Sequence, residues 1–139
     1  MRILILFTYL FVISSTAGAQ ISFIKKYSNN SYDRGEGAVQ LDDSSYLITG
    51  SSSSFDNASQ QAFIMKIDSV GKMLWSRNYG GKETDKGTRI FSVKNDGIYV
   101  IGQSNSFGNN FYDLYFFKTD LSGNLIFEKQ IGGNEYEDI

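Results

Sequence analysis

Two short charged segments are the first candidates for chemistry in this sequence. Asp33-Arg34-Gly35 and Asp85-Lys86-Gly87 place an acid beside a base, 52 residues apart. Together with the long polar loop over residues 51–61, such pairs can surround a ligand. The alternative, which we favour, is that each Asp accepts backbone N–H groups and ties successive repeats together, because catalytic residues rarely recur in every repeat.

The absence of two residue types excludes several kinds of catalytic and metal site. The chain has no His and no Cys, which excludes Ser-His-Asp and Cys-His catalysis, His-ligated zinc or copper, and thiolate sites. Asp68 and Asp120 each begin an Asp-x-x-Gly stretch that resembles part of a calcium loop. Each stretch offers a single carboxylate, so an Asp-capped turn ending in a glycine with positive φ is the favoured interpretation. Gly80-Gly81 lacks the spacing of a phosphate-binding loop. We therefore predict no catalytic, cofactor-binding or metal-binding residue.

Aromatic side chains suggest either ligand contacts or packing. Phe55 and Phe107 lie in loops rich in Ser and Asn, where they can stack on a sugar or fold back as apolar plugs between repeats; we favour plugs. Phe23, Trp75 and Phe127 are 52 residues apart and are predicted to form core between repeats. The polar stretches 51–54 and 105–110 offer hydrogen bonds to a glycan or peptide, although many inert loops share this composition.

A repeat of 52 residues must position these side chains. Residues 62–81 recur as residues 114–133, and residues 27–78 match residues 79–130 at eleven identical positions. Chance would give roughly four matches, so the 52-residue spacing indicates an internal repeat. The pattern predicts strands at 37–42, 46–50, 62–67 and 73–79, and again at 89–93, 98–102, 111–119 and 125–131. It also predicts a leading strand at 21–27, a polar loop at 28–36, and turns at 43–45 and 95–97. No helical periodicity is present.

Four strands in each unit of about fifty residues are typical of a β-propeller blade. The sequence predicts an all-β fold with two four-stranded antiparallel blades, one over about 37–79 and one over about 88–131. Residues 21–27 are a candidate blade-closing strand, and residues 132–139 a third repeat's start, within a repeat region spanning 20–139. A sandwich-like all-β fold is the alternative. Two blades cannot close a ring, so we expect an incomplete propeller belonging to a longer protein, or copies that assemble into a ring.

The first nineteen residues predict export rather than fold. Arg2 precedes an apolar run over 3–13, and Ala17-Gly18-Ala19 has the small-x-small pattern of a signal-peptidase site. The run is too short for a membrane anchor, which is the alternative, and no other run approaches that length. Removing residues 1–19 leaves 12 basic and 15 acidic residues, a net charge of −3, which argues against nucleic-acid binding. Without Cys there are no disulfides, so stability must come from packing.

A family resemblance follows from motif residues in both copies. Those residues are Asp113, Tyr115, Phe116, Phe117, Lys118, Asp120 and Gly123; Gly80, Gly81, Asp85 and Gly87; and Asp96, Gly97, Tyr99, Val100, Gly102, Ser104, Ser106 and Phe107. Their pattern resembles the SBBP-type seven-bladed β-propeller repeats of exported Bacteroidetes-like surface proteins. The chain departs from it at Asp56 and Gly108, where the family usually has Pro. The resemblance implies a fragment of a large bacterial surface protein, sometimes with a C-terminal sorting domain.

Two functions remain open from the sequence. The favoured one is a non-catalytic, secreted or cell-surface repeat module that serves as a scaffold or recognition surface for a protein or glycan partner. It needs no cofactor, and the remaining blades of the same chain, or other copies, are further partners. The alternative is a fragment of a propeller lyase, hydrolase or quinoprotein-like enzyme whose catalytic residues lie in other blades.

Overall fold

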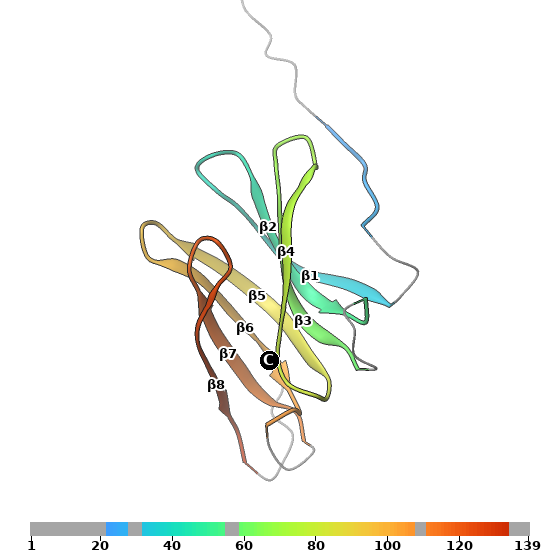
Figure 1. Cartoon of the computed structure of the whole chain (residues 1–139), viewed down its shortest axis with the longest axis vertical. Helices are drawn as coiled ribbons and strands as arrows, with labels where there is room; N and C mark the ends of the chain where they lie inside the picture. The colour runs from blue at the N-terminus through green and yellow to red at the C-terminus, as the bar shows by residue number, and fades with distance from the viewer. Residues whose placement is uncertain (1–21, 28–31, 55–58, 108–110, 134–139) are drawn as a thin grey trace, which may run out of the picture.

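The computed structural model describes residues 22–27, 32–54, 59–107 and 111–133, and within them the chain forms two β-sheets (Figure 1). The strands are β1 Asp33–Gln40, β2 Tyr46–Ser52, β3 Gln61–Ile67, β4 Met73–Tyr79, β5 Asp85–Val93, β6 Gly97–Ser104, β7 Asp113–Thr119 and β8 Leu125–Ile131. β1–β4 form the first sheet and β5–β8 the second, each antiparallel and in chain order. The all-β prediction is confirmed. The two sheets of the described residues pack on each other and do not close into a ring.

Helices are absent from the described ranges, and so is any helix long and apolar enough to cross a membrane. The predicted signal peptide at 1–19 lies outside the described residues. The same holds for residues 134–139 of the predicted third repeat.

The 52-residue unit is a structural repeat as well as a sequence repeat. The pairing of β1 with β2 shifts register between Gly35 and Gly37, and β5 with β6 shifts between Gly87 and Arg89. A second shift, between Lys66 and Ile67 on β3, recurs 52 residues later on β7. A β-bulge adds local twist at a defined place. Because both irregularities recur at the same spacing, the two sheets have the same backbone plan.

The first strand of each sheet is longer than predicted. β1 begins at Asp33, inside the expected polar loop 28–36, and β5 begins at Asp85, before the expected blade boundary at 88. The loop prediction is therefore wrong for residues 33–36. These residues are polar because they pair with serines, Asp33 opposite Ser52 and Asp85 opposite Ser104, and so they show no apolar alternation.

The main core lies between the two sheets. Its buried members are Leu47, Ala62, Ile64 and Tyr79 from the first sheet, and Ile90, Ile98, Val100, Tyr115 and Phe117 from the second. A smaller cluster of Phe63, Met65 and Ile67 lies on the opposite face of β3. Both faces of β3 are therefore covered. Full burial of one such large apolar side chain contributes about 1.5–3 kcal/mol.

The Asp-x-x-Gly turns have the predicted geometry. Asp68 Oδ1 accepts the N–H groups of Val70 (3.0 Å) and Lys72 (2.8 Å), and Gly71 has φ +75°. Asp120 does the same for its own turn, in which the N–H groups of residues 122 and 124 both lie 2.8 Å from its Oδ1. A side-chain carboxylate that caps the turn replaces backbone partners, and the glycine supplies the left-handed conformation.

A tyrosine anchors each turn from the preceding unit. The Tyr79 hydroxyl donates to the carbonyl of Gly123 at 2.7 Å. The equivalent pair in the preceding unit is Tyr27, whose hydroxyl donates to the carbonyl of Gly71 at 2.5 Å. Burial raises the pKa of Tyr79 to about 12. Residues 22–27 form no strand, contrary to the prediction for 21–27. Two side chains of this segment, Phe23 and Tyr27, nevertheless contact Gly71 as Trp75 and Tyr79 contact Gly123.

The aromatic column Phe23, Trp75 and Phe127 only partly forms core. Trp75 is half-buried, packs against the main core, and covers Gly123, where an added Cβ would lie 3.0 Å from its ring. Phe23 covers Gly71 in the same way but is 37% exposed, and Phe127 is 42% exposed. The prediction of inter-repeat core is wrong for Phe127, because no third sheet covers β8 among the described residues.

Candidate functional site

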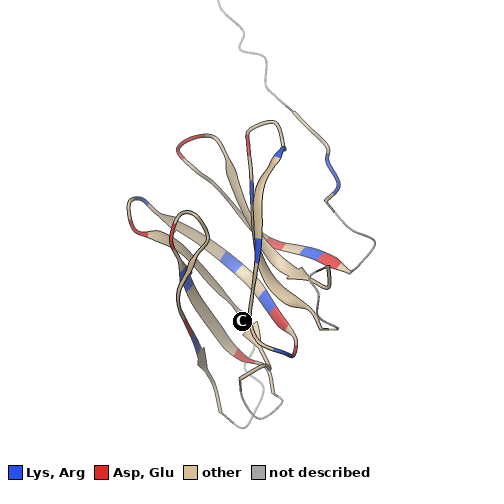
Figure 2. Ribbon diagram, in the orientation of Figure 1, with Lys and Arg blue, Asp and Glu red and all other residues tan. Residues whose placement is uncertain are grey.

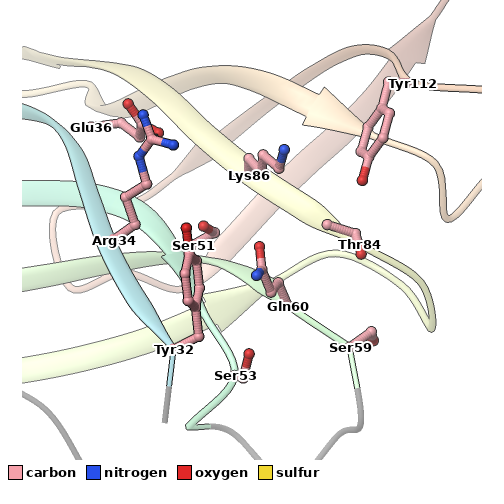
Figure 3. Close-up of a pocket in the computed structure, with 10 residues that line it drawn as sticks. All are labelled: Tyr32, Arg34, Glu36, Ser51, Ser53, Ser59, Gln60, Thr84, Lys86 and Tyr112. Atoms are coloured by element: carbon pink, nitrogen blue, oxygen red, sulfur yellow. The ribbon is translucent and has the colours of Figure 1, made fainter.

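A polar groove lies between the two sheets (Figure 3). It encloses about 450 Å³ and lies where the first strands of the sheets, β1 and β5, approach each other. Its lining residues are Tyr32, Arg34, Glu36, Ser51, Ser53, Ser59, Gln60, Thr84, Lys86 and Tyr112. The volume is within the range of small-ligand sites. Both copies of the charged segment reach this groove.

Within each charged segment, the aspartate and the neighbouring cation point to opposite sides of the strand. Successive side chains on a strand point to opposite sides, so Asp85 turns into the protein while Lys86 lines the groove. On β1, Asp33 and Arg34 likewise point to opposite sides of the strand. Figure 2 shows basic and acidic residues along β1 and β5, as well as at the turns. The groove thus receives one cation from each repeat.

The groove cations have different partners. Arg34 Nε lies 2.7 Å from Glu36 Oε1, and the Arg34 side chain is 62% exposed. Lys86 Nζ lies 4.9 Å from the centroid of the Tyr112 ring, a cation–π distance. Figure 3 shows Arg34 with Glu36 on one wall and Lys86 between that wall and Tyr112. The charged groups are therefore spread across the groove.

Behind the groove, Asp85 organises a buried hydrogen-bond cluster. The Ser106 hydroxyl donates to Asp85 Oδ2 at 2.8 Å, the Gly81 N–H at 2.9 Å, and Ser104 donates as well. The carboxyl group is fully buried, and this burial raises its pKa despite the three donors. Since Gly81 follows β4 while Ser104 ends β6 and Ser106 follows it, Asp85 ties the first sheet to the second.

The first repeat contains the matching cluster. Ser52 and Ser54 both donate to Asp33 Oδ1, Ser54 at 2.9 Å, and the Ser52 hydroxyl accepts the N–H of residue 54 at 3.0 Å. We call each set of one aspartate and two serines an Asp–Ser cluster. The even-numbered serines of the 51–54 run face Asp33, whereas Ser51 and Ser53 line the groove.

Hydrogen bonds hold the groove walls in place. The Thr84 backbone is fixed at both ends by Asn105, whose Oδ1 accepts the Thr84 N–H at 2.8 Å and whose N–H donates to the Thr84 carbonyl at 3.2 Å. The carbonyl of Gln60 accepts the N–H of Asp85 at 2.9 Å. Ser59 donates to the carbonyl of Lys82 at 2.7 Å. A wall fixed before binding loses less conformational entropy when a ligand arrives.

The outcome for the charged segments combines the two interpretations made from sequence. The favoured one, in which the aspartate accepts a backbone N–H and ties repeats together, is confirmed for Asp85. The neighbouring cations Arg34 and Lys86 nevertheless line a groove, as the alternative supposed. Alternation on one strand allows both, because each segment presents two faces.

The loop aromatics and the Gly-Gly segment contribute to packing. The Phe107 ring lies 5.9 Å from the ring of Tyr115, although Phe107 itself remains 48% exposed. An added Cβ on Gly81 would meet Ser106, so the close approach of the two sheets requires a glycine there. Phe55 and residues 108–110 lie outside the described residues.

Several groove residues were not singled out from sequence. Tyr32, Glu36, Thr84 and Tyr112 come from three places in the chain, around residues 32–36, 84 and 112, and these places meet only through the stacking of the sheets. Glu36 and Tyr32 lie at alternate positions with Arg34, a period-2 signal that would have indicated a strand face. Nothing in the sequence spacing indicates Tyr112.

The described side chains hold no group of three or more His, Cys, Asp or Glu residues arranged for a metal. Within the groove, Glu36 is the single carboxylate and is paired with Arg34. The arrangement suits ligand binding through hydrogen bonds and charge. No protein-family model matches this sequence, and no curated protein matches it.

Proposed function

We propose that the chain is a non-catalytic recognition module of an exported, propeller-like repeat protein, whose inter-sheet groove binds a protein or glycan partner. The observation that carries the proposal is the groove itself, a 450 Å³ hollow to which both repeats deliver the same cationic position, Arg34 and Lys86. Repeat folds commonly bind at surfaces built by neighbouring units.

The propeller-like arrangement is supported by the repeated tyrosine contact. Tyr79 bonds the turn of the second unit as Tyr27 bonds that of the first, so the contact is head-to-tail and can be extended. Three residues of the first sheet, Val39, Trp75 and Tyr79, pack against the core, and their counterparts Phe91, Phe127 and Ile131 are each 42–50% exposed. We propose that a further copy of the unit packs on this face.

A paired groove-blocking experiment tests the recognition function. Ser53→Trp fills the groove, whereas Ser122→Trp adds the same bulk at an exposed turn at the far end of β7. Both variants and the wild type are applied to an array of neutral and acidic oligosaccharides and of peptides. Binding to one class that Ser53→Trp abolishes and Ser122→Trp preserves supports the proposal. Absence of binding, or equal binding by both variants, contradicts it, provided both retain the wild-type melting temperature.

A further inference from the structure

One groove cation lacks an anionic partner in the described chain. Across the described chain, four basic side chains form ion pairs with carboxylates at 2.7–3.2 Å, namely Arg34, Lys66, Lys94 and Lys118. Lys86 makes none of these, and its described contact is the face of the Tyr112 ring. A cation over an aromatic face keeps much of its charge available to an anion.

The groove has a local excess of positive charge. Its lining includes two cations, Arg34 and Lys86, against the single anion Glu36, which leaves +1, although the whole chain carries −2. Low-dielectric walls concentrate the field of such a charge within a cleft. An anionic group is therefore the ligand chemistry that this groove attracts.

The remaining lining favours a saccharide over a peptide. Six of the ten lining side chains carry hydroxyl groups, namely Tyr32, Ser51, Ser53, Ser59, Thr84 and Tyr112, and a seventh, Gln60, carries an amide. None is aliphatic, so an apolar peptide side chain would find no apolar wall. Hydroxyl and amide groups instead match the alternating donors and acceptors of a sugar.

The two tyrosines add stacking surfaces. Tyr32, 56% exposed, precedes β1, and Tyr112 precedes β7; Figure 3 shows them at opposite sides of the groove with Lys86 between them. An aromatic ring with a polar tip offers an apolar face to the C–H side of a sugar and a hydroxyl for hydrogen bonding.

We propose that the groove binds an acidic saccharide, with its carboxylate at Lys86 and Arg34 and its ring between Tyr32 and Tyr112. This proposal rests on the groove being a recognition site and specifies the class of its ligand. Arg34 can shift from Glu36 to the incoming carboxylate or hold the sugar hydroxyls while paired. Lys86 is the charge that the ligand neutralises.

Calorimetry with matched probes tests the proposal. Trigalacturonate is compared with its methyl ester, which keeps the sugar skeleton but carries no charge, and with a tetraglutamate peptide. Lys86→Gln removes the groove charge, Lys86→Arg keeps it, and Lys94→Gln removes an equivalent charge at the far end of β5, where Lys94 pairs with Asp42. We expect trigalacturonate to bind at least about tenfold more tightly than its ester, and Lys86→Gln to weaken it by about tenfold or more. Lys86→Arg and Lys94→Gln are expected to bind like the wild type.

Three outcomes would overturn the proposal, and they separate it from the proposed function. If the ester binds as well as the acid and Ser53→Trp blocks both, the groove recognises glycans but not their charge. If tetraglutamate binds more tightly than trigalacturonate and requires Lys86, the ligand is an acidic peptide. If no probe and no array member binds, the recognition function itself fails.

Discussion

The first and second sheets share one 52-residue plan but differ in what covers them. In the first sheet, the last residue of β4, Tyr79, is 6% exposed because it packs on Phe117 of the second sheet, with ring centroids 4.6 Å apart. Its counterpart at the end of β8, Ile131, is 49% exposed. The same position in the repeat is therefore core in one copy and surface in the other. What decides burial is the presence of a neighbouring unit on that face.

Alanine variants at Tyr79 and Ile131 are expected to give the largest difference in the free energy of unfolding. Tyr79→Ala removes a buried ring and its hydrogen bond to Gly123, so we expect a loss of about 3–5 kcal/mol in the free energy of unfolding. Ile131→Ala removes a half-exposed side chain and is expected to cost below about 1 kcal/mol. Urea unfolding of both variants measures the difference. Equal losses would mean that the sheets do not stack as described.

The two Asp–Ser clusters provide the next test. Asp85→Ala leaves the Ser104 and Ser106 hydroxyls and a backbone N–H without their buried acceptor, and we expect a loss of about 2–4 kcal/mol. Asp33 is only partly buried, whereas Asp85 is fully buried, so Asp33→Ala is expected to cost less, about 1 kcal/mol. Chemical denaturation of each variant gives these values. A larger loss for Asp33→Ala than for Asp85→Ala would contradict this difference between the two clusters.

Trp75 and Phe127 occupy equivalent positions in the two repeats. Their alanine variants should differ less in stability than the two pairs above. Trp75 is half-buried over Gly123, so Trp75→Ala is expected to cost about 2 kcal/mol, below the value for a fully buried ring. Phe127 is exposed on one side and has a described ring contact at 5.6 Å with Phe116. We expect Phe127→Ala to cost about 1 kcal/mol. Melting curves that rank Phe127→Ala as the more damaging change would contradict the exposure of β8.

The pH dependence of stability offers a smaller contrast between two aspartates. Because burial raises the pKa of Asp85, the folded state holds its proton more tightly than the unfolded state, and stability is lost as pH rises from about 4 through the folded pKa. Asp85→Asn removes this titration, so the variant should gain on the wild type over that range. Asp43 is the opposite case, because its hydrogen bonds from Ser45 lower its pKa to about 2.

For Asp43→Asn, the wild type should lose its advantage as pH falls from about 4 to about 2, since the carboxylate of Asp43 is then protonated. Urea midpoints measured at several pH values test both slopes. Parallel curves for wild type and Asp85→Asn would mean that the Asp85 carboxyl is not desolvated in the folded protein.

The repeat and its apolar strands were predictable from sequence because they follow local rules. Alternating or continuous apolar residues marked β2, β3, β6 and β7, and the turns at Asp68 and Asp120 followed from side-chain capping. Polar beginnings of β1 and β5 were missed, since Asp33 and Asp85 face serines rather than an apolar core. Periodicity rules detect a strand only where one side of it is apolar.

The groove was only half predictable. Arg34 and Lys86 were identified by their repeated spacing, but their meeting with Tyr112 depends on how one sheet stacks on the other. Sequence spacing contains no direct information on such a tertiary approach. Similarly, Phe127 matched the column of Trp75, yet no sequence pattern states whether a neighbouring unit covers that position.

The central claim is that the two units stack face to face through one interface, with Tyr79 of the first unit packed on Phe117 of the second. A double-mutant cycle tests it most directly, using Tyr79→Leu, Phe117→Leu and the double variant, with free energies of unfolding from urea titration. Stacked rings in contact predict a coupling energy of about 0.5–1.5 kcal/mol. Strict additivity, with a coupling energy indistinguishable from zero, would contradict the stacking of the two units.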